Sequence, residues 1–134
     1  MSTRQFYTTG MICLLFGVLI GCGHPRITGK VIFPDGTPLS KGQVVFENEK
    51  HTYTGKIRED GTFRMGVLKD GEGIPPGKYQ VAVSGANDEE IFDPEQPPRV
   101  TPLIAARFRS PKTSGLEFDI QKSTTDISIV VEKP

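Results

Sequence analysis

Apolar and polar residues alternate with a period of two through most of the chain from Ile27 onward. In the first run, Ile27–Phe33, Val31 shares one side with the apolar ends, while Thr28 and Lys30 lie on the other. Because successive side chains of a strand point to opposite faces, this pattern predicts a half-buried β-strand. Six further runs show the same alternation. Two of them are Gln43–Glu47 and Lys78–Ser84. The other four have as their inward residues Tyr53, Gly55 and Ile57; Phe63, Met65 and Val67; Leu116, Phe118 and Ile120; and Ile127, Ile129 and Val131.

Turn-forming residues separate several of these runs. Pro34-Asp35-Gly36 and Asp60-Gly61 supply the aspartate and the positive-φ glycine that tight reversals need. Pro76-Gly77 has the sequence of a type II turn, with Lys78–Ser84 directly after it. No run has a helical stripe. A one-sided sheet must cover its apolar face, so the sequence predicts an all-β domain, a seven-stranded antiparallel β-sandwich of two layers.

The N-terminal segment has the three zones of an export signal. Arg4 gives a basic start, Met11–Ile20 is apolar, and Leu19-Ile20-Gly21-Cys22 places small residues at the cut. The apolar run is shorter than the roughly 20 residues of a membrane span, so an uncleaved anchor would have to recruit Phe6 and Tyr7. The other alternative is a plain secretory signal with an incidental cysteine.

Leu19, Ile20, Gly21 and Cys22 resemble the lipobox of bacterial lipoproteins. The resemblance implies that Cys22 takes a diacylglyceryl thioether and, after cleavage, an N-acyl chain such as palmitate. Two acyl chains anchor a protein stably to a membrane, whereas a single chain gives only marginal membrane binding. We therefore expect a signal peptide at 1–21, a lipidated tether at 22–26 and one domain at 27–134, held on a membrane of the cell envelope and facing the periplasm or the cell exterior. Gly23 favours the outer membrane by the same resemblance.

The length and charge of the exported chain restrict its class. Removal of residues 1–21 leaves 113 residues (134 − 21), which fits one domain that buries about two thirds of its unfolded surface. Cys13 leaves with the signal and Cys22 carries lipid, so no disulfide is expected. The 15 remaining Lys and Arg (16 less Arg4) against 16 Asp and Glu form no basic cluster. Nucleic acid is therefore excluded as a partner.

Residues 85–115 interrupt the alternation with many acids and prolines. We expect an irregular surface excursion, because Pro102 disfavours regular pairing, and Leu103–Phe108 is predicted as either a short helix or an edge strand. Four apolar residues of this excursion form the candidate interaction surface: Phe92, Leu103, Ile104 and Phe108. They either dock another envelope protein or cover an open end of the sandwich. The acids lack the spacing of a calcium loop, so a solvated charged loop is favoured over calcium binding.

Several motifs together resemble the carboxypeptidase regulatory-like, or transthyretin-like, domain. They are VIFPDGTPL at 31–39, GQVVF at 42–46, DGTF at 60–63 and PGKYQV at 76–81. FRSPKTSGL at 108–116 further resembles the small planctomycete-type lipoproteins that carry this domain after a lipobox. The resemblance implies a prealbumin-like sandwich, an extracytoplasmic location and no known catalysis, and Cys22 is the one functional residue that it assigns.

The inventory of catalytic side chains is small. The exported chain has two histidines, His24 in the tether and His51 in an expected loop, and neither has the supporting base or orienting group that a hydrolase needs. We therefore expect no catalytic residues, no metal and no cofactor apart from the lipid. The expected function is a structural or binding module for an envelope protein or glycan. The alternative is a small-molecule carrier or enzyme with a pocket formed by the 85–115 loop.

Overall fold

The computed structural model describes residues 24–66 and 73–134, which form nine strands and one short 3₁₀ helix. All seven predicted runs contain a strand, and the prediction of an all-β fold is confirmed. The bounds are β1 Ile27–Ile32, β2 Gln43–Glu47, β3 Thr52–Lys56, β4 Thr62–Arg64, β5 Gly77–Ser84, β6 Asn87–Glu90, β7 Arg99–Pro102, the helix η1 Ala106–Arg109, β8 Leu116–Ile120 and β9 Thr124–Val130. Val67, expected in the fourth run, lies outside the described residues.

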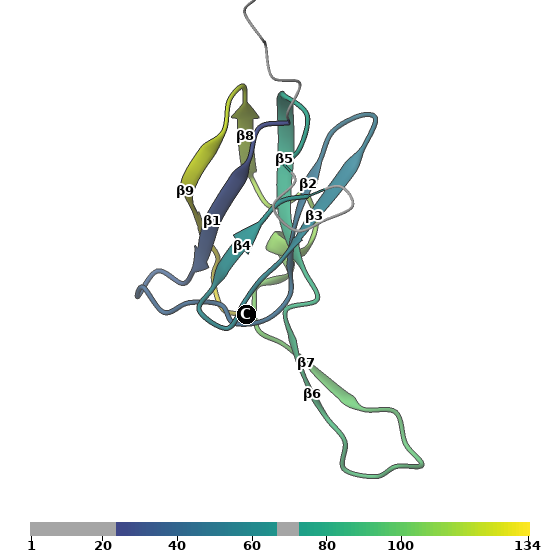
Figure 1. Cartoon of the computed structure of the whole chain (residues 1–134). Helices are drawn as coiled ribbons and strands as arrows, with labels where there is room; N and C mark the ends of the chain where they lie inside the picture. The colour runs from purple at the N-terminus through teal and green to yellow at the C-terminus, as the bar shows by residue number, and fades with distance from the viewer. Residues whose placement is uncertain (1–23, 67–72) are drawn as a thin grey trace, which may run out of the picture.

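The strands form three sheets (Figure 1): β4-β1-β9, β3-β2-β5-β8, and the separate pair β6-β7. The first two sheets face each other in a sandwich-like body. The count of seven strands and the fully antiparallel arrangement are corrected here, because β6 and β7 are additional and β1 pairs with β9 in parallel. Alternation specifies which face of a strand is buried, but it contains no information about the direction of the neighbouring strand.

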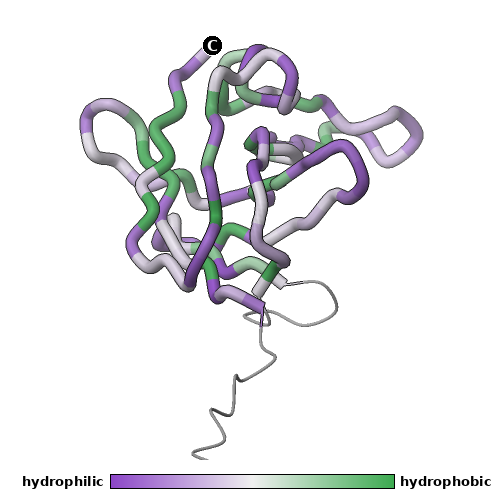
Figure 2. Tube along the Cα trace, turned by 90° about the horizontal axis from the view of Figure 1, so that it is seen from above, coloured by the Kyte–Doolittle hydropathy of each residue, from purple (hydrophilic) through white to green (hydrophobic). Residues whose placement is uncertain are grey.

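The core lies between these two sheets and includes most inward positions of the predicted runs, together with buried residues outside those runs such as Leu39, Ile74 and Ala86. Figure 2 shows apolar positions alternating with polar ones along the strands. Phe46 and Tyr79 are fully enclosed, and their ring centroids lie 5.9 Å apart in an edge-on arrangement. The Tyr79 hydroxyl donates a hydrogen bond to the Pro75 carbonyl at 2.5 Å, and burial raises the pKa of this phenol. The alternation therefore predicted most of the core, although Leu116 and Phe118, which were expected to face inward, are only partly buried.

The two aspartate-glycine turns form as expected. Gly36 and Gly61 have φ values of 87° and 82°, which glycine adopts without steric cost. Hydrogen bonds from Thr62 Oγ1 at 2.6 Å and Thr62 N at 3.0 Å lower the pKa of Asp60 below its usual value. The expected type II turn is wrong: Gly77 has φ 155° and already belongs to β5, whereas that turn needs about 80°.

The sandwich has two distinct ends along the strand direction. At one end, Arg26 precedes β1, and its backbone bonds to Ser123 and Thr124 in the turn between β8 and β9. Gly77, at the start of β5, pairs with Ile120 at this same end. β5 then runs to Ser84 at the opposite end, where the β6-β7 pair begins (Figure 1). The residues that follow the lipobox and the β6-β7 pair therefore lie at opposite ends of the body.

The free edge of β9 is irregular. Its pairing with β1 shifts register between Ile27 and Gly29, and Asp126, at φ 62°, is the one non-glycine residue with positive φ among the described residues. Such a bulge twists an edge strand and hinders pairing with another chain. The bulge therefore makes β9 a less regular template for pairing with another strand.

Candidate functional site

A two-stranded hairpin projects from the end of the body that lies away from Arg26. This arm, residues 87–102, pairs β6 with β7 from Asn87 opposite Pro102 to Glu90 opposite Arg99, and Figure 1 shows it extending beyond both sheets. The expectation of an irregular excursion is therefore corrected. Pro102 is compatible with pairing because it ends β7 on an isolated pair, where its missing N–H interrupts no further strand.

The tip of the arm is a tight turn. The Gln96 amide donates to the Asp93 carbonyl at 3.1 Å, and the Glu95 amide donates to the Asp93 carboxylate at 2.9 Å. Pro94 occupies the second position of this turn, where its fixed φ favours a reversal. The Asp93-Pro94 pair was therefore a turn signal in the sequence, and it marks the hairpin that the alternation did not reveal.

Large apolar side chains are exposed on this arm. Ile91 is 73% exposed, Phe92 76% and Val100 49%. Among the described residues, the one other exposed large apolar side chain is Val130, on β9 at 43%. Adjacent exposed apolar side chains on a projecting segment are typical of an interaction site.

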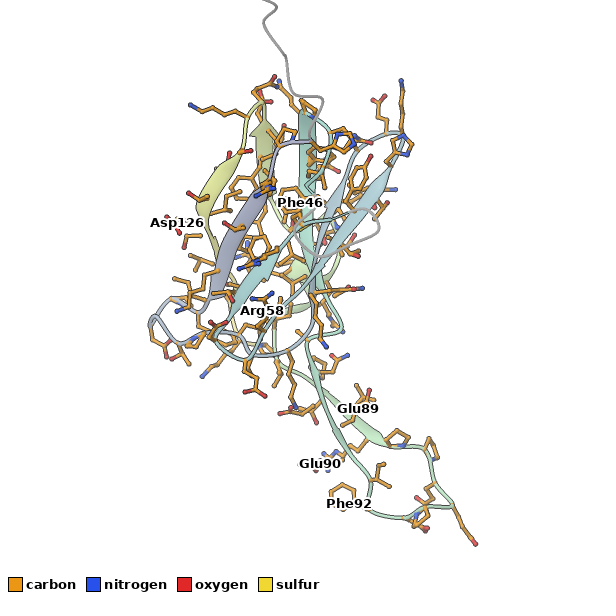
Figure 3. The ribbon with its side chains drawn as sticks, viewed as in Figure 1. Phe46, Arg58, Glu89, Glu90, Phe92 and Asp126 are labelled. Atoms are coloured by element: carbon orange, nitrogen blue, oxygen red, sulfur yellow. The ribbon has the colours of Figure 1, made fainter. Side chains whose placement is uncertain are left out.

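The arm is also strongly acidic. It carries Asp88, Glu89, Glu90, Asp93 and Glu95 against a single cation, Arg99, which gives a formal charge of −4 (1 − 5). Figure 3 shows Glu89, Glu90 and Phe92 together on the arm, outside the body. The arm thus combines apolar side chains with a surrounding negative charge.

The root of the arm is fixed to the body. The Leu103 amide donates to the Ala86 carbonyl at 2.9 Å, and Lys41 Nζ lies 2.5 Å from Asp88 Oδ1. Gly42 passes so close that an added Cβ would lie 2.7 Å from the Ser84 carbonyl oxygen. These contacts hold the base of the arm in a defined position.

The structure divides the candidate interaction surface of the sequence into two groups. Phe92 lies near the arm tip, whereas Ile104 and Phe108 are 0% and 3% exposed in the core, and Leu103 packs against that core. Three of the four residues are therefore corrected from a docking surface to the alternative, a cover over an opening between the sheets. Sequence reasoning missed Ile91 and Val100, whose exposure depends on the hairpin geometry.

The segment after the arm closes one side of the body. β8 pairs with β5 from Gly77 to Val81, so the rest of β5 has no partner from β8. Beside it, η1 packs against β5, and the buried Ser114 hydroxyl donates to the Val81 carbonyl. The Ala105 amide donates to the Glu132 carbonyl at 2.7 Å, which joins this segment to the residues after β9. Phe108 and Ile104 thus fill the space where the two sheets leave the core uncovered.

Two surface hollows bear on the alternative of a ligand pocket. One of about 650 Å³ lies along β2, β5 and β8 and is lined by side chains of both charges, including Glu47, Lys78 and Glu117. The other, about 370 Å³, lies at the arm root between Leu39, Leu103 and Asp88, but the Asp88 carboxylate is engaged by Lys41. Neither lining contains a histidine or a cysteine. Both hollows therefore have mixed polar and charged linings.

The histidines and acids do not converge on a reactive centre. His51 is exposed with its ring centroid 6.0 Å from that of Tyr53, and His24 is exposed before β1. Within 24–66 and 73–134, no group of three or more His, Cys, Asp or Glu side chains could hold a metal ion. The described residues thus supply no acidic cage in the 85–115 segment for calcium.

The lipobox Leu19-Ile20-Gly21-Cys22 lies outside the described residues. Of the expected tether 22–26, Pro25 is buried and its carbonyl accepts a hydrogen bond from Ile74 N at 3.1 Å, while Arg26 bonds to Ser123 and Thr124. These two residues therefore belong to the folded body and not to a free tether. In the part of the chain that the structure describes, no helix has the length and apolar character to cross a membrane.

No family model matches this chain, and neither the curated proteins nor the solved structures contain a match.

Proposed function

We propose that this protein is a non-enzymatic lipoprotein of the bacterial cell envelope, anchored through Cys22, whose β-sandwich presents a binding arm to another envelope component. The observation that carries this proposal is the exposure of Ile91 and Phe92 at the end of a hairpin with a fixed root. Leaving such side chains in water is unfavourable, and binding residues are concentrated on loops that a rigid scaffold positions.

The placement of the arm supports the proposal. Arg26 lies at one end of the sandwich and the arm leaves the other. Since Pro25 and Arg26 are bound to the body, a lipid on Cys22 would be separated from it by very few residues. An acylated cysteine would hold that end near the headgroups, and the arm would then extend from the far end. We place the protein on the outer membrane, facing the periplasm or the cell exterior.

A binding role also agrees better with the surface chemistry than catalysis does. The hollow along β2, β5 and β8 is lined by Lys and Glu side chains, and the exposed His51 is not among them. A catalytic site would require a nucleophile, a base and an orienting group within hydrogen-bond reach of one another. The arm, in contrast, needs only a complementary surface on its partner.

We further propose that the body is a prealbumin-like domain of the carboxypeptidase regulatory-like type. The two facing sheets contain three and four strands, which together give the seven strands of that fold. The β6-β7 arm is then an insertion between the strands β5 and β8 of one sheet. This assignment separates a scaffold function of the body from a binding function of the arm.

Two measurements test the proposal. Fatty-acid labelling of Cys22→Ala should show loss of label and accumulation of a precursor, and equal label in mutant and wild type would contradict the lipid anchor. For the arm, a photoreactive residue at position 92 of the full chain should crosslink in intact cells. The matched control is the same residue at Val130, which is exposed on the body. Equal or absent crosslinking at both positions would contradict a binding arm.

A further inference from the structure

We propose that the arm binds a protein whose surface has an apolar pocket bordered by Lys or Arg side chains. This inference depends on the proposed binding function of the arm and adds the class and chemistry of the partner. Phe92 and Ile91 would enter the pocket, and the neighbouring carboxylates would face the cations at its rim.

The apolar pocket of the partner is inferred from Ile91 and Phe92. These side chains are consecutive and both more than 70% exposed, so together they offer aromatic and aliphatic area at a position where the body covers neither. Aromatic anchors that enter a pocket carry much of the energy of an interface. A glycan ligand is less favoured, because the arm carries no Trp or Tyr to stack on a sugar ring.

The basic rim of the partner's pocket is inferred from the acids of the arm that are not bound at its root. Lys41 binds Asp88, which leaves Glu89, Glu90, Asp93 and Glu95 against Arg99 along the rest of the arm. A formal charge of −3 (1 − 4) beside the apolar side chains attracts a positively charged rim and accelerates the encounter. The same charge repels an anionic lipid surface.

The charge also argues against pairing of the arms of two copies of this chain. Beyond its root, β6 carries Glu89 and Glu90. Pairing of two such strands would place like charges beside one another, which is destabilising. The partner is therefore a different protein with the opposite charge.

The arm is also prepared for binding. Asp93 closes the tip turn with two backbone amides, and Pro94, Pro97 and Pro98 restrict the backbone between β6 and β7. A loop that is already ordered loses less conformational entropy when a partner binds. The exposed side chains are thus presented in a restricted geometry.

Crosslinking from position 92 of the full chain, in isolated envelopes, tests the partner class. With the photoreactive residue at 92, we compare the wild-type arm with Glu89→Lys/Glu90→Lys and with Glu89→Gln/Glu90→Gln. Glu49→Lys on the β2-β3 turn is the control for a charge reversal outside the arm. We expect a heterologous protein adduct that falls by roughly tenfold in the reversed variant, less in the neutral variant and not in Glu49→Lys. Raising NaCl from about 0.05 to 0.5 M should lower the wild-type yield severalfold.

The outcomes separate this inference from the proposed function. A protein adduct that responds neither to charge reversal nor to salt would overturn the basic rim and leave the binding arm in place. An adduct between two copies of this chain, or with lipid, would overturn the partner class. Absence of any adduct at 92 would overturn both, and the thermal unfolding of each variant confirms that its body is folded.

Discussion

The two halves of the 85–115 segment have similar apolar content, but the large apolar side chains are exposed in one half and buried in the other. Ile91 and Phe92, in the first half, are more than 70% exposed, whereas Ile104 and Phe108, in the second half, are at most 3% exposed. The second half passes beside the unpaired part of β5 and bonds to Val81 and Glu132, while the first half leaves the body. Burial here is decided by the route of the chain past an open side of the sandwich, and not by local hydrophobicity.

The largest expected effect contrasts Phe108→Ala with Phe92→Ala. Loss of the buried Phe108 ring leaves a cavity beside β5, so its substitution should lower the free energy of unfolding by about 3–5 kcal/mol. Phe92→Ala removes an exposed ring and should change stability by less than about 0.5 kcal/mol. Urea unfolding of both variants measures the difference, and equal losses would show that the two halves are packed alike.

Ser114→Ala should have the next largest effect. Its hydroxyl is buried and donates to the Val81 carbonyl, so the substitution leaves a buried acceptor without this donor and should cost about 1–3 kcal/mol. Thr101→Ala on the exposed arm strand β7 is the matched control, with little expected change. A similar midpoint in urea for Ser114→Ala and wild type would show that this bond does not hold the second half in place.

The ion pair at the arm root should contribute little. Lys41 and Asp88 side chains are 54% and 49% exposed, and exposed pairs typically contribute about 0.2–1 kcal/mol. A double-mutant cycle of Lys41→Ala and Asp88→Ala, followed by urea unfolding at low and high salt, measures this coupling. A coupling that is large and independent of salt would indicate that the arm root is more closely integrated with the core than its exposure implies.

The smallest effect involves the body alone and depends on pH. The pKa of Asp60 is lowered from 3.8 by its bonds from Thr62. A carboxyl with a lowered folded pKa stabilises the fold above its unfolded pKa, and this contribution is lost as pH falls through the folded pKa. The stability advantage of wild type over Asp60→Asn should therefore be constant near neutral pH and shrink below pH 3.8. An advantage that persists unchanged in acid would contradict this role of the turn.

Sequence reasoning predicted the seven strands of the body because each of them has a one-sided pattern. Phe46 and Val81, for example, were expected to face inward and are both 0% exposed. It did not reach the parallel pairing of β1 with β9, since partner choice depends on contacts between distant segments. It also grouped Phe92 with Phe108, because an apolar residue in an acidic, proline-rich segment has no period from which burial can be inferred.

For the candidate site, Phe92 and the acids could be named from the sequence, but the arm itself could not. The sequence signal that indicates the arm is Asp93-Pro94, a turn motif between the short runs that form β6 and β7. These runs lack alternation because neither face of the arm packs on a core. Geometry was therefore needed to separate exposed from buried apolar residues.

The parallel pairing of β1 with β9 has a consequence for how the chain acquires its structure. Arg26 and Ser123, which bond beside this pair, are 97 positions apart in the sequence, so β1 obtains its second neighbour only after nearly all intervening residues have become available. Closing so long a loop is entropically costly and slows folding. During synthesis, β1 must therefore remain without its β9 neighbour until the end of the domain has been made.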